Sequence, residues 1–509
     1  MSNAAAPMRP LEPMQGLSLI LVAIAISVAN FMQTLDLTIA NVAVPTIAGD
    51  LGVSPNMGTW MLTSFATPLA ITLPLTGWLA QRFGQVRLFR ISVILFVVTS
   101  VLCGLAPNFE SLLVFRALQG AASGPLTALS QALLIAVFPP ARRNVALAVW
   151  QTTTFVAPVL GPIIGGWITD NIAWPWIFYV NAPIGVLVVI LLTRGLAGRD
   201  NPTRKLPVDV TGLVLLAIAF GSLQLFLDRG QDLDWFSATP ICVLAALFVV
   251  SFIALILWEL TDAHPIVDLR LFADRNFTAG TIAVTVGFGV YYAALVLVPL
   301  WLQTQQGYTA TWAGIATAPL GLAGIVIAPL IGRFQSRVDP RWLATLALIG
   351  WGAASFWRMG FNTDVPIDDI AFNSLLMGAA TACFITPLVS LSISGLPRDR
   401  LPAASGLQNA LRRIGTSVAT SVGPTYFERR SRVHHTYLVD RISAIDPATS
   451  DWMSSLERAG MSAQGALASV GRVVDVQAHM LALNDFSFGC LLLFAATLLV
   501  VWSTQYRRV

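Results

Sequence analysis

Long, nearly uninterrupted apolar segments constrain this chain more than any other feature of its sequence. They run for about 18–25 residues, the length that an α-helix needs to cross a hydrocarbon core of about 30 Å. Only helices and closed barrels satisfy their backbone polar groups in lipid, and segments this long and continuous predict helices. The 509 residues are 56% hydrophobic and 11% charged, whereas a soluble domain carries about 25% charged residues. We therefore expect an all-α membrane protein.

The apolar pattern predicts fourteen spans, an even number that places both termini on one side of the membrane. The predicted spans are 17–44, 56–80, 87–106, 111–138, 144–168, 174–194, 210–228, 239–258, 279–302, 310–332, 342–358, 371–395, 403–426 and 484–503. Arginines alternate correctly from loop to loop if both termini are cytoplasmic. The short loops on the other side then hold only Arg229 and Arg358, as the positive-inside rule predicts.

The sequence also repeats internally. The second span is followed by Pro74-Leu75-Thr76-Gly77, and the tenth is followed by the corresponding Pro329-Leu330-Ile331-Gly332. Arg82 likewise corresponds to Arg337, and all these pairs are 255 residues apart. This repeat predicts two six-helix bundles, 1–195 and 263–509, with two inserted linker helices in 196–262. Paired repeats with a site near the membrane midplane are the architecture of secondary transporters.

The segment 427–483 is polar and lies on the non-cytoplasmic, periplasmic side in this topology. Within it, residues 451–482 carry apolar residues at helical spacing. Two interpretations stay open at this point. The segment is either a solvated loop or a docking surface for a partner outside the membrane.

The sequence also limits the energy source and the chemistry. A phosphate-binding P-loop needs a Gly-Lys-Ser/Thr motif, but the only lysine is Lys205, between Arg204 and Leu206. We therefore expect no ATP hydrolysis, no cofactor, and an ion gradient as the driving force. No histidine or cysteine has metal-ligand spacing, and no nucleophile–base set indicates an enzyme.

Ionisable residues inside spans cost roughly 2.5–3.5 kcal/mol each on insertion scales, and they are functional candidates by default. Asp36 lies in the first span, about 11 Å below the outer surface at 1.5 Å per residue. It stands at the edge of a polar helical stripe that includes Asn30 and Gln33. Such a stripe lines a cavity, so both amides are candidate substrate contacts. Because burial favours the neutral carboxyl, Asp36 is a candidate for proton coupling. A structural hydrogen-bonding role is the alternative.

Two further spans carry arginines. Arg116 opens the fourth span, either as a buried cation that tunes a carboxylate or as a side chain reaching the interface. Arg412 and Arg413 lie a third to halfway through the thirteenth span, so at least one should face a central cavity or pair across it. Gln408 and Asn409 share faces with them and are candidate substrate contacts.

Aromatic residues within spans are candidate contacts for a large apolar substrate, although packing is the more common role of any one of them. The candidates are Phe155, Tyr292 and Phe384. In the fifth span, Pro158, Gly161, Pro162 and Gly165 alternate. The glycines permit close helix packing, and the interleaved prolines indicate a hinge between the halves.

Three motifs resemble the major facilitator superfamily. Gly77-Trp78-Leu79-Ala80-Gln81-Arg82-Phe83-Gly84 is similar to the superfamily's loop 2–3 signature, with Gln81 where an aspartate is usual. Ala157–Gly166 resembles the antiporter signature of its fifth helix, and Leu35–Pro45 resembles the first-helix signature of the fourteen-helix drug:proton antiporters. The resemblance extends from end to end, including Gln224–Gly230, and is closest to EmrB-type exporters.

The resemblance implies a proton-coupled antiporter in the bacterial inner membrane that exports hydrophobic drugs from the cytoplasm or inner leaflet. It further implies a tripartite efflux pump with a periplasmic adaptor of the EmrA type and an outer-membrane channel of the TolC type. It carries over Asp36, Arg116 and Arg412 as proton-coupling residues, and Gly77, Arg82 and Gly84 as gating residues. An uptake symporter of the same fold and a non-transporting receptor or scaffold are the alternatives.

Overall fold

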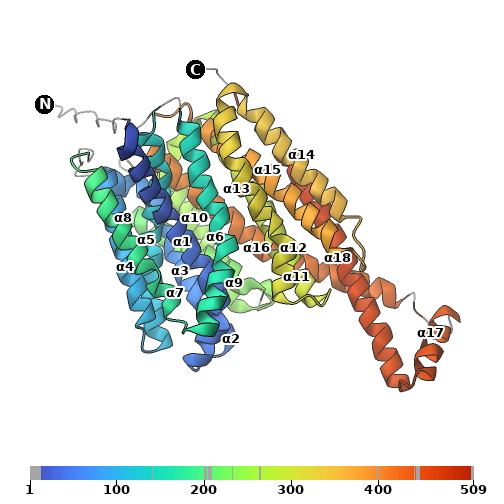
Figure 1. The fold of residues 1–509 in the computed structure, drawn as a ribbon. Coiled ribbons are helices and arrows are strands. Elements are labelled where there is room, and N and C mark those ends of the chain that lie inside the picture. The colour runs from blue at the N-terminus through green and yellow to red at the C-terminus, as the bar shows by residue number, and fades with distance from the viewer. Residues whose placement is uncertain are drawn as a thin grey trace.

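The computed structural model describes residues 13–139, 142–199, 203, 209–231, 233–262, 265–397, 400–440, 442 and 447–505. Within these ranges every regular element is a helix, and the long helices run side by side in one bundle (Figure 1). The first helix begins and the last helix ends at the same end of this bundle, the upper end in Figure 1.

The first set of helices contains α1 to α8. Their bounds are α1 Gly16–Asp50, α2 Pro55–Gly58, α3 Trp60–Phe83, α4 Gln85–Gly104, α5 Phe109–Val137, α6 Arg143–Asn171, α7 Trp176–Tyr179 and α8 Asn181–Gly195. The sequence explains several ends. Asn108 and Ser111 form a capping box that starts α5, and α3 ends at Gly84, whose φ of 86° favours glycine.

The second set contains α11 to α18. Their bounds are α11 Arg275–Thr304, α12 Ala310–Thr317, α13 Pro319–Phe334, α14 Pro340–Arg358, α15 Ile367–Ile393, α16 Leu401–Val439, α17 Pro447–Arg458 and α18 Ala463–Trp502, with short 3-10 turns at Leu269–Ala273 and Gln335–Arg337. The predicted span 310–332 is divided between α12 and α13, because Pro319 has no N–H with which to continue the helix.

The packing follows the sequence repeat. In the first set α3 packs on α5, α5 on α4, α1 on α6, and α8 on both α1 and α4. In the second set α13 packs on α15, α15 on α14, α11 on α16, and α18 on both α11 and α14. Each of these contacts in one set has its counterpart in the other.

Two helices lie between these sets in the chain, α9 (Val210–Gly230) and α10 (Thr239–Thr261), joined through a turn at Trp235–Ser237. α9 packs against α3 of the first set and α16 of the second, whereas α10 packs mainly on α9. The side chains of α10 are largely exposed and apolar. This exposure fits a helix that borders lipid at the edge of the bundle.

Among the described residues, eleven helices are long and apolar enough to cross a membrane. The long helices α6, α14 and α16 fall outside this set. They nevertheless pack among the spanning helices, α6 on α1, α14 on α15, and α16 on α11. α16 carries Arg412 and Arg413, which lower its mean hydropathy, and surrounding helices shield these charges from lipid.

The structure corrects the interpretation of residues 427–483 as a loop. α16 continues to Val439 and α18 already begins at Ala463, so both helices extend well beyond the predicted span limits at 426 and 484. Outside the bundle the two helices are tied by Asp485, which accepts hydrogen bonds from Arg430 at 2.6 Å and from His434 at 2.7 Å. The extension projects from one end of the bundle and carries α17 at its tip (Figure 1).

Glycine permits the closest helix contacts in both sets. A Cβ on Gly120 of α5 would overlap the Phe65 carbonyl oxygen of α3, and a Cβ on Gly378 of α15 would overlap the Leu320 carbonyl oxygen of α13. Phe65 and Leu320 are related by the repeat offset of 255, and Gly120 and Gly378 lie on the corresponding helices α5 and α15. Close backbone approach at small residues is how helices pack tightly in lipid.

We therefore expect Gly378→Ala to destabilise the protein by about 1–3 kcal/mol, because the new methyl meets backbone that cannot move aside easily. Thermal unfolding of the purified protein in detergent measures the effect. Gly489→Ala is the matched control, since a Cβ at Gly489 meets nothing within 4 Å. Equal melting temperatures for the two variants would contradict this account of the packing.

Candidate functional site: a central cavity and a buried ion pair

A cavity of about 580 Å³ lies between the two sets of helices. Residues from α1, α3, α5, α6, α9, α11 and α16 line it. It reaches Thr59, at the start of α3, and Gln231, which follows α9. Of the predicted substrate contacts, Asn30, Gln33, Tyr292 and Asn409 lie in the lining, as does Arg412.

Hydrogen bonds hold the polar stripe of α1 in place along this cavity. Asn30 donates through Nδ2 to Thr153 Oγ1 of α6 at 2.7 Å, and Gln33 Oε1 accepts from Thr127 Oγ1 of α5 at 3.1 Å. Asn409 on the opposite wall donates to Gln131 Oε1 of α5 at 2.7 Å. These amides are oriented by the protein and are therefore positioned before any substrate binds.

Asp36 lies outside the cavity lining. The sequence placed it at the edge of the polar stripe, and in the structure that edge turns toward α5 and α8. Arg116 Nη1 donates to Asp36 Oδ2 at 2.7 Å, with both side chains at most 1% exposed. Asp36 Oδ1 accepts from Gln119 Nε2 at 3.1 Å and from Asn181 Nδ2 at 2.8 Å.

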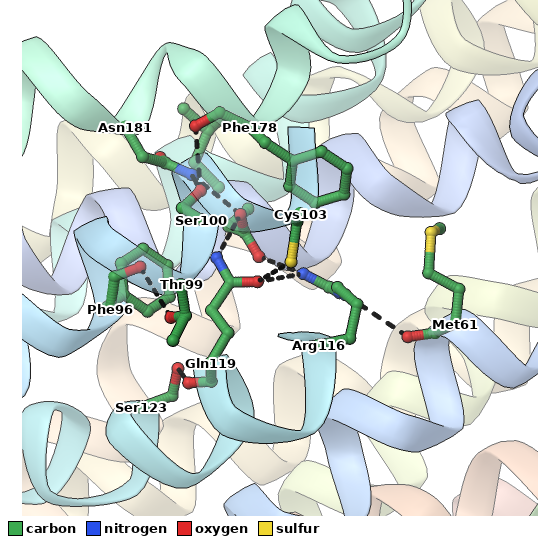
Figure 2. Close-up of polar contacts among 12 residues, drawn as sticks. Met61, Phe96, Thr99, Ser100, Cys103, Arg116, Gln119, Ser123, Phe178 and Asn181 are labelled. Atoms are coloured by element: carbon green, nitrogen blue, oxygen red, sulfur yellow. Dashed lines mark hydrogen bonds and ion pairs between the residues drawn. The ribbon is translucent and has the colours of Figure 1, made fainter. Parts of the chain in front are cut away.

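Further contacts surround this ion pair, as Figure 2 shows for Arg116, Gln119, Asn181 and Ser100. Arg116 also donates to Gln119 Oε1 at 2.8 Å, and its guanidinium lies 4.4 Å from the ring centre of Phe65. Asn181 donates in addition to Ser100 Oγ at 2.9 Å. Arg116 is thus a fully buried partner of Asp36, and the alternative of an arginine reaching the interface is wrong.

Arg412 and Arg413 lie in the cavity wall, away from Asp36. The guanidinium of Arg412 stacks between the rings of Trp150 and Phe288, at 5.3 and 5.2 Å from their centres. The Nε atom of Arg413 is buried without a hydrogen-bond partner in the described part of the chain. Neither arginine forms an ion pair there. Both positive charges therefore face the cavity without a carboxylate side chain paired to them.

Two predicted substrate contacts are wrong in position. Gln408 points away from the cavity and donates to Ser392 Oγ of α15 at 2.8 Å. Phe384 is fully buried beneath Trp351, with ring centres 4.5 Å apart. Both side chains face the interior of the second set of helices. The prediction failed because the sequence does not show which face of each helix borders the cavity. Phe155 lies on α6, but its side chain is outside the described part of the structure.

Asp228 is a site residue that was not predicted from the sequence. Its motif was noted, but the seventh span was predicted to end there, which places a charge at the membrane surface. α9 instead continues to Gly230, and Asp228 lines the cavity. The signal that could have revealed it was the polar face shared by Gln224 and Asp228, four residues apart on one helix.

Gly77, one of the residues predicted to gate the protein, lies where the two sets of helices meet. A Cβ on Gly77 of α3 would collide with Ala403 of α16, and a Cβ on Gly332 of α13 would collide with Ala148 of α6. At the offset of 255 residues, Gly77 corresponds to Gly332 and Ala148 corresponds to Ala403. The two contacts therefore close the bundle symmetrically at one end, opposite the end that the cavity reaches.

The remaining predicted gate residues lie at the end of α3, and the predicted hinge residues lie in α6. The Arg82 guanidinium lies 5.3 Å from the ring centre of Trp78. Gly161 and Gly165 let α6 pack directly against Thr38 and Ile39 of α1. Pro158 and Pro162 lie in α6, but their side chains are not described. Close packing between α1 and α6 accounts for both glycines, and a hinge role stays a prediction.

The fold and cavity define a polytopic helical membrane protein with two repeated halves around a central site. The Major Facilitator Superfamily model matches residues 26–420. The multidrug export protein EmrB of Haemophilus influenzae is 44% identical over 503 residues, 99% of this chain and 98% of that protein. The fatty acid resistance protein FarB of Neisseria gonorrhoeae is 42% identical over 490 residues, 96% of this chain and 97% of that protein.

Solved structures show the same fold at low sequence identity. The human organic anion transporter MFSD10 has a TM-score of 0.58 at 15% identity, over 96% of this chain and all of that one. The proton:xylose symporter XylE has a TM-score of 0.56 at 13% identity, over 93% of this chain and 94% of that one. The chain belongs to the major facilitator superfamily and, within it, to the EmrB family.

We expect Asp36→Asn to destabilise the protein by about 3–5 kcal/mol, because Arg116 is then left as a buried charge without its counter-ion. The double variant Asp36→Asn with Arg116→Gln should be more stable than the single one, since it removes both charges. Thermal unfolding in detergent measures both. A single variant as stable as the native protein would show that the ion pair with Arg116 does not stabilise the fold.

Proposed function

We propose that this chain is a proton-coupled exporter of hydrophobic drugs and toxicants in the bacterial inner membrane. It is a multi-pass membrane transporter rather than an enzyme. The observation that carries the proposal is the 44% identity to multidrug export proteins over 99% of the chain, together with a central cavity between two repeated halves. The proton gradient drives export, with no ATP and no cofactor.

We assign fourteen membrane crossings, with both termini in the cytoplasm. α6, α14 and α16 join the eleven more apolar spans, and α7 with α8, and α12 with α13, each make one crossing. Residues 1–195 and 263–509 form the two halves, and 196–262 supply α9 and α10. In this topology the Gly77–Ala403 contact closes the cytoplasmic end. The cavity then faces outward, as a transporter does when it releases its substrate outside.

The charge of the cavity narrows the substrate class. Its described lining contains three arginines (Arg229, Arg412 and Arg413) and one aspartate (Asp228), a formal net charge of +2 (+3 − 1). The rest of the surface combines uncharged polar side chains with apolar and aromatic ones, including Trp150, Phe288 and Tyr292. This combination favours hydrophobic molecules with an acidic group over lipophilic cations. A fatty acid is such a molecule, and one relative is named for resistance to fatty acids.

Transport in inverted membrane vesicles tests the function. An imposed proton gradient, acidic inside, should drive a fluorescent hydrophobic acid into the vesicles, and an ionophore that collapses the gradient should stop it. A matched cationic dye should accumulate less, because the cavity is net positive. Vesicles without the protein are the control. Accumulation only in right-side-out vesicles would favour an uptake symporter, and no transport of any probe would favour a receptor or scaffold.

The extension formed by the ends of α16 and α18 and by α17 supports a second part of the proposal. It lies on the periplasmic side, where α17 presents Trp452 at its surface. We assign it as the docking surface for an adaptor of the EmrA type, through which a channel of the TolC type completes a tripartite pump.

Replacing α17, Pro447–Arg458, by a glycine–serine linker of equal length should abolish crosslinking to the adaptor, because the presented side chains are removed. Deleting the whole of 451–482 is unsuitable, since it would remove the first half of the continuous helix α18. The variant should still insert in the membrane and bind the fluorescent acid. Undiminished crosslinking would place the adaptor elsewhere on the protein.

A further inference from the structure

The inserted helix α9 bridges the two halves near the open end of the cavity. Ser421 of α16 donates to the Leu227 carbonyl oxygen at 2.6 Å, and Trp235, just after α9, donates through Nε1 to Thr425 Oγ1 of α16 at 3.2 Å. On its other side α9 packs against α3 of the first half. Any motion that brings the outer ends of α3 and α16 together must therefore rearrange the contacts of α9.

Asp228 forms the polar contact between α9 and α3. Its Oδ2 accepts from Thr63 Oγ1 of α3 at 2.7 Å, and its Oδ1 accepts from Gln224 Nε2 of α9 at 2.9 Å. Gln224 is itself held from α16, since its Oε1 accepts from Ser417 Oγ at 3.3 Å. The carboxylate thus sits in a chain of hydrogen bonds that runs from one half to the other.

The surroundings of Asp228 differ from those of Asp36 in two respects. Asp228 is half-buried and lines the cavity, whereas Asp36 is sealed behind it. Asp36 is paired with a buried arginine, and its protonation would leave that arginine uncompensated. Asp228 is held by a hydroxyl and an amide, with no ion pair within 4 Å among the described residues. Protonating Asp228 therefore breaks no ion pair.

The charged and titratable groups that face Asp228 come from three helices. Arg229 precedes the end of its own helix, Arg412 and Arg413 line the cavity from α16, and the phenol of Tyr292 lines it from α11. The lining residues of α3 contain no ionisable group, and α10 contributes none to the cavity. A proton that enters from the outer side meets Asp228 as the one carboxylate among the described lining residues.

We propose that Asp228 is a second proton-binding group of the transport cycle, the one that exchanges protons with the outer side while the cavity faces outward. This inference rests on the proposed function of proton-coupled export. A proton from outer water binds one carboxylate oxygen, and that oxygen becomes a hydrogen-bond donor. The carboxyl group can then no longer accept hydrogen bonds from both Thr63 and Gln224. The contact of α9 with α3 loosens, the halves close at the outer end, and the proton leaves to the cytoplasm after the cavity has turned inward.

Purified protein in liposomes allows coupling to be separated from substrate exchange. Accumulation of the fluorescent acid driven by a proton gradient measures coupling, and counterflow at equal pH on both sides measures exchange. We expect Asp228→Asn to lose gradient-driven accumulation and to keep measurable counterflow that no longer varies with pH. Asp228→Glu should restore both the accumulation and the pH profile. Asp234→Asn is the matched control, an exposed aspartate in the following turn, and should behave as the native protein.

Three results would overturn the proposal. Native gradient-driven accumulation by Asp228→Asn would show that the carboxylate is dispensable for coupling. Loss of counterflow in a variant with a native melting temperature would make Asp228 a substrate-binding residue instead. Counterflow without gradient-driven accumulation in the native protein would overturn proton-coupled export itself, and with it this inference.

Discussion

Each charge inside this bundle has to be surrounded by protein or by water, because exposure of a charged side chain to hydrocarbon costs roughly 2.5–3.5 kcal/mol on insertion scales. The chain meets this constraint in two ways. Asp36 and Arg116 neutralise each other in a sealed site between α1 and α5. Arg412 and Arg413 instead face the central cavity. The charges in α16 therefore require the cavity, which also offers space for a substrate.

The repeat controls how the two halves can meet. Because Gly77 and Ala403 are related to Gly332 and Ala148 by one offset, the same close contact occurs twice, once on each side of the pseudo-symmetry axis. Two equivalent contacts at one end close that end evenly and leave the cavity open toward the other. Small side chains at all four positions allow this contact to form and to separate without rearranging larger groups.

The inserted helices give this protein features beyond the two repeated halves. α9 contacts both halves and contributes Asp228 to the cavity, while α10 covers α9 on its lipid side. Together with the extension at the ends of α16 and α18, they occupy regions where the two halves are not equivalent.

The sequence by itself determined the helical class, the repeat and most helix positions, because a span is a local property of about twenty consecutive residues. It also identified Asp36, Arg116 and Arg412 as unusual, since each is a charge within an apolar segment. Which face of a helix meets which neighbour was decided only by the tertiary structure. In the structure Asp36 is sealed in a buried site together with Arg116. Gln408 and Phe384 lie away from the cavity, whereas Asp228 lines it. In a membrane both faces of a buried helix are apolar, so the orientation of a side chain depends on packing between distant segments and leaves little trace in local sequence.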